Sequence, residues 1–392
     1  MSKKTAIVVI HGIGEQKPFE TLDAFVRPLA KAIARNIRCQ HDLIWFKEWG
    51  ESCISLLDDA KIHSQIDVLE YYWSHLTQRK ISSKEIIDWI ITVAQGAERY
   101  YSKPKQKSSE RNERLFIADG EFKHLKYLIT MISWGGWLKY IFYLLLNIGE
   151  FLPFVKNTIK VQKVAFNLVS PFIGKILVNY FGDVTLYSTT DAKSEYYTVR
   201  QEILNGAVEK VRMILENDEY DKILLCGHSL GSVIVYDVID RLNMLIQNNQ
   251  ELREKAIDKL KGMVSFGSPL DKIAFFFDEH INRSKQPVRY AITSYLHGFR
   301  RNNIDRPIEI DSTMRGYLCD IPWFNFWCST DPAGGHLDVY AGVENIKLDF
   351  APKRGKNKFL SFLSDIKLSI DSHNFYWEAD EMYKRIVKEL GL

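Results

Sequence analysis

Residues 222–236 read KILLCGHSLGSVIVY, and this stretch decides the predicted fold. Its first half is a continuous apolar run typical of a buried strand, and the apolar spacing of its second half favours a buried helix. Gly227 and Gly231 stand two positions either side of Ser229, where the absence of a Cβ allows crowded backbone segments to pass each other. We therefore predict a sharp strand-to-helix turn at Ser229, with the N–H of Leu230 among the first helical amides directed at the space before the hydroxyl.

A second turn near the N-terminus completes the pattern. Residues 5–10 are rich in β-branched side chains, as expected for a strand buried on both faces, and His11-Gly12 follows them directly. With the GHSLG turn, this His-Gly loop resembles the lipase and esterase members of the α/β-hydrolase superfamily. The resemblance implies an α/β fold with a mostly parallel central sheet and helices on both faces. It also implies an oxyanion hole formed by the backbone N–H of Leu230 and by that of Ile13 or Gly12.

The same resemblance implies that a catalytic acid and then a catalytic base follow the serine along the chain. Asp331 comes directly after a predicted strand at 323–328, and the Pro and Gly residues beyond it favour a turn that presents a carboxylate. Asp311 and Asp320 are weaker candidates because both precede that strand. We therefore expect Asp331 to be the acid.

Two histidines compete for the role of the base. His373 lies beyond the last predicted strand, at 345–350, and just ahead of a predicted C-terminal helix. No strand is predicted between Asp331 and His336, whereas the family layout requires one there. His373 is therefore preferred, and the expected catalytic set is Ser229, Asp331 and His373.

The hydrolase pattern is interrupted between the two halves of the predicted core. Residues 55–75 and 81–100 are predicted to be helical, and residues 127–155 are the most apolar part of the chain. Lys139 interrupts that apolar run, which favours two shorter helices over a membrane-spanning one. We therefore expect a hydrolase core at 1–60 and 183–392, with a largely helical cap inserted at 61–182.

The aromatic residues of this insertion have two interpretations. They either pack on the hydrolase core, or they form a pocket for an acyl chain and bring the cap to a membrane surface, where Trp and Tyr side chains are favoured. Under the second interpretation, the candidate substrate-binding residues are Trp134, Trp137 and Phe142.

Composition limits the classes of protein that remain. The 392 residues carry a net charge of +3, which gives no support to nucleic-acid binding, and an apolar content of 46%, which excludes global disorder. Five widely spaced cysteines without a C-x-x-C pair predict reduced thiols and a cytoplasmic protein, with peripheral membrane contact only through the cap. No histidine pair or glycine-rich loop has the spacing of a metal or nucleotide site, so neither a metal nor a cofactor is expected. The sequence leaves the oligomeric state undefined.

These features predict a serine hydrolase that cleaves carboxylic esters of apolar acyl or lipid substrates through an acyl-Ser229 intermediate. Two alternatives stay open. An acyltransferase would use the same three side chains but hand the acyl group to an alcohol or amine. A non-catalytic protein of the hydrolase fold would bind lipid or a partner protein through the insertion.

Overall fold

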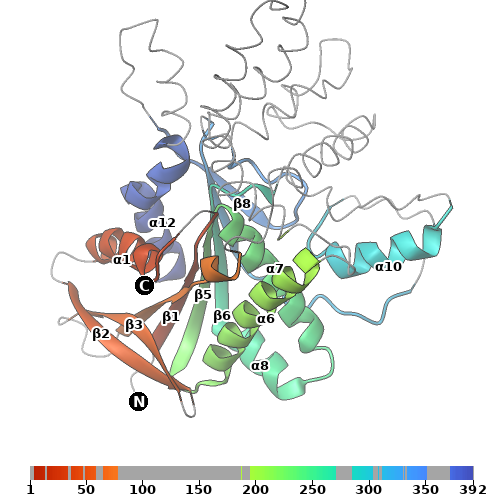
Figure 1. Cartoon of the computed structure of the whole chain (residues 1–392), viewed down its shortest axis with the longest axis horizontal. Coiled ribbons are helices and arrows are strands. Elements are labelled where there is room, and N and C mark those ends of the chain that lie inside the picture. The colour runs from red at the N-terminus through yellow and green to blue at the C-terminus, as the bar shows by residue number, and fades with distance from the viewer. Residues whose placement is uncertain are drawn as a thin grey trace, which may run out of the picture.

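The computed structural model describes the N-terminal segment of the chain and most of its C-terminal half. The described residues are 4–13, 16–33, 37–46, 49–58, 65–77, 187, 195–270, 285–302, 308, 311–329, 331, 333–350 and 371–391. Within them, an eight-stranded sheet is covered by helices on both of its faces (Figure 1).

The central part of the sheet is parallel. β1 (Lys4–Ile10) pairs in parallel with β4 (Gln65–Tyr71) on one side and with β5 (Tyr220–His228) on the other. The parallel pairing continues from β5 through β6 (Leu260–Phe266), β7 (Trp323–Trp327) and β8 (Val343–Lys347). The expected mostly parallel α/β sheet is confirmed, and the residues that follow these strands meet at its carboxyl edge.

A hairpin completes the sheet beyond β4. β2 (Ile37–Phe46) and β3 (Trp49–Asp58) pair antiparallel along their whole length, and β3 also pairs antiparallel with β4. The strand order is therefore β2-β3-β4-β1-β5-β6-β7-β8, which leaves β2 and β8 at the two edges.

Helices enclose the sheet between two layers. α1 (Glu20–Ile33) and α12 (Asp380–Leu390) cover one face, whereas α6 (Glu195–Glu216), α7 (Leu230–Leu245) and α8 (Gln250–Lys259) cover the other (Figure 1). A further helix, α10 (Pro287–His297), lies in the connection between β6 and β7. The expected helix at Glu195–Glu216 is confirmed at both of its ends.

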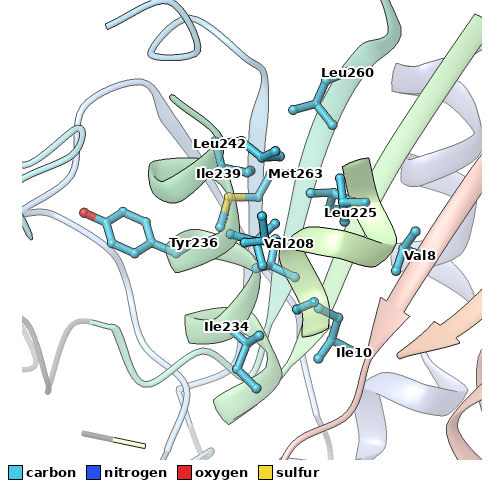
Figure 2. Packing of buried hydrophobic residues seen from close by; sticks show 14 of the residues in the cluster. Val8, Ile10, Val208, Leu225, Ile234, Tyr236, Ile239, Leu242, Leu260 and Met263 are labelled. Atoms are coloured by element: carbon cyan, nitrogen blue, oxygen red, sulfur yellow. The ribbon is translucent and has the colours of Figure 1, made fainter. Parts of the chain in front are cut away.

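The sheet separates two apolar clusters. On the α7 side, Val8, Leu225 and Met263 of the sheet pack with Ile234 and Ile239 of the helix (Figure 2). On the opposite side, the side chains of α1 and α12 pack together over β1 and β5. Because burial of a large aliphatic side chain contributes about 1.5–3 kcal/mol, these two clusters hold the parallel strands in place beneath the carboxyl edge.

The turn predicted around Ser229 is present. β5 ends at His228, α7 begins at Leu230, and Ser229 between them has a φ of 51° and a ψ of −126°. A Cβ on Gly227 would lie 2.5 Å from the Gly231 carbonyl oxygen, and one on Gly231 would lie 2.2 Å from the Ile10 carbonyl oxygen. The two glycines are therefore required because backbone from β1 and from α7 occupies the space of their side chains.

The helix predicted at 55–75 is wrong, and with it the start of the insertion at 61. Residues 65–71 form β4, which is buried and lies beside β1 in the core. The strand contains two acidic residues, Asp67 and Glu70, and both side chains are buried. Asp67 accepts hydrogen bonds from Ser55 and Tyr220, and Glu70 accepts one from the backbone N–H of Phe19 ahead of α1.

The remainder of the predicted cap, residues 78–182, lies outside the described residues, as do the candidate substrate-binding residues Trp134, Trp137 and Phe142. Within the part of the chain that the structure describes, no helix is both long enough and apolar enough to cross a bilayer. All five cysteines are described, and none of them forms a disulfide.

The contact between Gly231 and β1 predicts a large effect of a single methyl group. Gly231→Ala would place its Cβ against the carbonyls of Ile10 and His11, which are backbone atoms that cannot rotate away. We expect a loss of about 3 kcal/mol in the free energy of unfolding, measured by urea denaturation. The control is Gly50→Ala, because the nearest atoms to a Cβ there are 3.5 Å away, and a change of less than about 1 kcal/mol is expected. Equal stability of the two variants would contradict the packing described for the turn.

Candidate active site

Three hydrogen bonds to the backbone of Ser229, from residues of β6 and α7, hold it at the carboxyl edge. Its N–H donates to the Phe266 carbonyl at the end of β6 (3.0 Å), and its carbonyl accepts from both the N–H and the hydroxyl of Ser232 (3.0 and 2.5 Å). The hydroxyl of Ser229 is buried and has no hydrogen-bond partner among the described residues. A positive φ in a non-glycine residue is uncommon, and these bonds maintain it at the one position where the serine must stand above the sheet.

Asp331 and His373 are brought together from elements that are 42 residues apart in the chain. The Nδ1 atom of His373 lies 3.0 Å from Oδ1 of Asp331, and a carboxylate accepts, so Nδ1 is the donor and Nε2 is left with its lone pair. Asp331 also accepts from the N–H of Ala333 at Oδ1 and from the hydroxyl of Tyr376 at Oδ2, both at 2.8 Å. With three donors around it, the buried carboxylate has a single orientation.

His228 connects this pair to the serine turn. Its Nε2 lies 2.9 Å from the carbonyl oxygen of His373, so Nε2 carries the proton and donates it. The two imidazole rings are 4.8 Å apart, and the His228 ring also contacts Phe266 and Trp377. Burial lowers the pKa of His228 to about 3, which keeps the ring neutral.

Gly267 fixes how closely His373 approaches the turn. It follows Phe266, whose carbonyl binds the N–H of Ser229, and a Cβ placed on it would lie 3.2 Å from Cε1 of His373. The His373 ring therefore lies over the residue next to the Ser229 backbone. The structure contains no hydrogen bond from the Ser229 hydroxyl to His373.

The loop after β1 lies directly against Ser229. A Cβ on Gly12 would be 2.7 Å from the Cβ of Ser229, so only a glycine brings this loop so close. Leu230 is the first residue of α7, and the first amides of a helix have no partner within the helix. Gly12 thus packs against Ser229, Leu230 follows the serine at the start of α7, and Ile13 follows Gly12 in the half-buried part of the loop.

His11 determines the shape of this loop. Its Nε2 accepts the N–H of Trp73 (3.1 Å) and its Nδ1 donates to the Gly12 carbonyl (2.8 Å), while the Trp73 and His11 rings stack at 4.7 Å. Burial lowers the pKa of His11 to about 4, in keeping with this neutral tautomer. Because a trans peptide points its C=O and N–H in opposite directions, holding the Gly12 carbonyl also fixes the direction of the Ile13 N–H.

The competing candidates lie elsewhere. His336 pairs with Asp338 and packs edge-on against Trp327, and no contact joins it to Asp331. Asp311 and Asp320 are exposed. Of the candidate acids and bases, the structure brings only Asp331 and His373 together.

Sequence reasoning did not find Tyr376 and Trp73. Tyr376 stands three residues after His373, a spacing that puts two side chains on one face of a tight helical turn, so this signal was available. Trp73 had no comparable signal, because the segment before it was assigned to a helix rather than to β4.

No protein-family model, curated protein or solved structure matches this chain. Within the described ranges, no group of three or more His, Cys, Asp or Glu side chains is arranged to hold a metal ion.

The two neutral histidines predict a loss of stability in acid. The pKa of a histidine in an unfolded chain is about 6.5. Below that pH, His11 and His228 bind protons in the unfolded chain but stay neutral in the folded protein. The stabilisation is complete above about pH 6.5, and it falls by up to about 1.4 kcal/mol per pH unit for each ring on acidification towards pH 4. Urea denaturation between pH 7.5 and pH 5 measures this slope.

The variants His11→Asn and His228→Gln should each reduce the slope, whereas His41→Gln, at an exposed histidine of β2, should not. A slope that is unchanged in both buried-site variants would show that these rings do not cause the acid sensitivity.

Proposed function

We propose that this chain is a serine hydrolase of the α/β-hydrolase fold that cleaves carboxylic esters of apolar acyl chains or lipids. The observation that carries the proposal is the pair of buried Asp331 and half-buried His373 near a serine in a strained strand-to-helix turn. A serine, an imidazole with a free Nε2 and a carboxylate that orients it are the groups needed to make a nucleophile from a hydroxyl.

The proposed reaction has two halves. Ser229 Oγ attacks the ester carbonyl while His373 Nε2 takes its proton, and the resulting imidazolium is stabilised by Asp331. The oxyanion is held by the N–H groups of Leu230 and of Ile13 or Gly12, and His373 returns the proton to the departing alcohol. Water then attacks the acyl-Ser229 with His373 again as the base, which releases the acid and restores the serine.

The substrate class is proposed from the sequence of the insertion. Residues 127–155 are the most apolar part of the chain, and an apolar cap over the carboxyl edge would bind an acyl chain and contact a membrane surface. On this proposal, long-chain esters are better substrates than acetyl esters.

If Ser229, Asp331 and His373 act together, the losses of activity on replacing them should not be additive. Ser229→Ala and His373→Ala should each lower kcat for ester hydrolysis by about 10⁴-fold or more, and the double variant should be no worse than either, because the residues act as one unit. The measurements are initial rates on p-nitrophenyl esters and labelling by a fluorophosphonate, which reports nucleophilic serine directly. The control is His336→Ala, which should keep both activities.

Absence of fluorophosphonate labelling in the folded wild-type protein would rule out the proposed hydrolase. Loss of turnover in His336→Ala with retention in His373→Ala would instead show that His336, and not His373, is the base.

Tyr376 is predicted to orient the acid. Tyr376→Phe removes the donor to Asp331 Oδ2, so the carboxylate loses one of the bonds that orient it. Because its negative charge is no longer shared with the tyrosine hydroxyl, it also attracts protonated His373 more strongly. We expect kcat to fall by about 10-fold with little change in KM, and the acid limb of the kcat profile to move to higher pH. The control is Tyr383→Phe, which removes a hydroxyl 3.5 Å from the Trp377 carbonyl without touching Asp331. A pH profile identical to that of the wild type would contradict an orienting role for Tyr376.

A further inference from the structure

Within the described part of the chain, no strand pairs with the outer side of β2 along its ten residues. β2 pairs with β3 without a bulge, contains no Pro or Gly, and has no partner on its outer side among the described residues. All side chains from Arg38 to Leu43 are exposed, and Leu43 and Trp45 are exposed to 42% and 64%. The opposite edge strand, β8, has only five residues.

Long open edges of this kind are rare in monomeric proteins, because their unpaired N–H and C=O groups can pair with another chain. Protective devices include a short strand, a bulge, a proline or charged side chains, and β2 has only the last of these, at Arg38 and Asp42. A straight edge of ten residues with two charged side chains is suited to pairing with a strand that offers opposite charges.

The unpaired amides of β2 can be identified. The N–H of Leu43 donates to Oδ1 of Asp42 at 2.8 Å, so it faces the open side rather than β3. Because backbone groups alternate in direction along a strand, the amides of Ile37, Cys39 and His41 face the same side.

The sequence of β2 is complementary to itself in an antiparallel arrangement. With a two-fold axis at Gln40, Arg38 lies opposite Asp42 of a second copy, and Asp42 lies opposite its Arg38. These are the only Asp, Glu, Lys or Arg side chains in the strand, so the register pairs every formal charge of β2 with an opposite one. A shift of the axis by one residue would place Arg38 opposite Ile44 or Gln40 instead, and neither of these carries a charge.

The same register is consistent with the backbone. The outward amides of Ile37 and Leu43 face each other, as do those of Cys39 and His41, which are the pairs that exchange hydrogen bonds. Arg38 and Asp42 then form a non-hydrogen-bonded pair, in which side chains approach most closely. Leu43 N–H would exchange its bond to Asp42 for the carbonyl of Ile37 in the second copy, which releases Asp42 to bind Arg38.

We propose that β2 is a dimerisation edge, at which two copies of this chain pair antiparallel about Gln40 to give one sheet continuous across both. The interface is isologous, as in most two-fold dimers. β2 is separated from β1 and the serine turn by β3 and β4, so dimer formation leaves both candidate active sites accessible. A strand edge buries less than the about 800 Å² per partner of a standard interface, and the dimer should dissociate on dilution.

A charge exchange tests the register. Sedimentation velocity of the full chain over a range of concentrations should give a monomer–dimer equilibrium. Arg38→Asp places a carboxylate opposite Asp42 of the second copy, and Asp42→Arg places two guanidinium groups opposite each other; each should raise the dissociation constant by at least about 10-fold. The double variant Arg38→Asp/Asp42→Arg restores opposite charges and should dimerise again.

A cysteine at the axis gives a second, independent test. Opposite residues of a non-hydrogen-bonded pair have Cα atoms about 4.5 Å apart, within the range that a disulfide spans. In a Cys39→Ser background, Gln40→Cys should therefore form an intermolecular disulfide on mild oxidation. The control Leu43→Cys should not form this disulfide, because residue 43 lies opposite Ile37 of the second copy and far from residue 43 of that copy.

A wild-type chain that stays monomeric at all concentrations would overturn the proposal, and so would single charge variants that dimerise as well as the wild type. Failure of the double variant to recover, with its thermal unfolding unchanged, would also overturn it. None of these results depends on ester hydrolysis, so the dimer and the proposed function are tested separately.

Discussion

The arrangement of the site depends on one backbone contact, between α7 at Gly231 and the end of β1 at Ile10 and His11. A Cβ on Gly231 would lie within 2.5 Å of two carbonyl oxygens, so the start of α7 rests on the end of β1 with no side chain between them. The same closeness puts Gly12 against the Cβ of Ser229. The loop after β1 and the turn after β5 are therefore one rigid unit, and the packing of the sheet on α7 sets their geometry.

His373 is positioned beside this unit by different contacts. β8 ends at Lys347, and residues 348–372 separate it from His373, so the preceding strand does not hold this histidine through a short loop. Its position is instead set by contacts on three sides: the His228 ring, the face of Gly267, and Asp331. The carboxylate is in turn held by Tyr376 from the same turn as His373, so two side chains of one short segment bind the two oxygens of one carboxylate.

The sequence predicts the structure best where steric constraints on the backbone are strongest. The turn at Ser229 could be predicted because two glycines at fixed spacing leave few other conformations, and the β-branched run before His11 similarly allowed little but a buried strand. β4 could not be found in this way. Its Asp67 and Glu70 look solvent-exposed in sequence, and only the side chains and amides that reach them from β3, β5 and the start of α1 make their burial tolerable.

Three histidines gather at the carboxyl edge, and the structure distinguishes them by their partners. His11 and His228 each donate one ring N–H to a backbone carbonyl, and burial lowers the pKa of both well below neutrality. His373 alone faces a carboxylate. If the two neighbours were charged, an imidazolium at His373 would meet like charge at 4.8 Å, the distance between its ring and that of His228. Keeping both neutral confines the positive charge to the one ring that Asp331 can stabilise, which is the electrostatic condition that the proposed proton transfer to and from Ser229 requires.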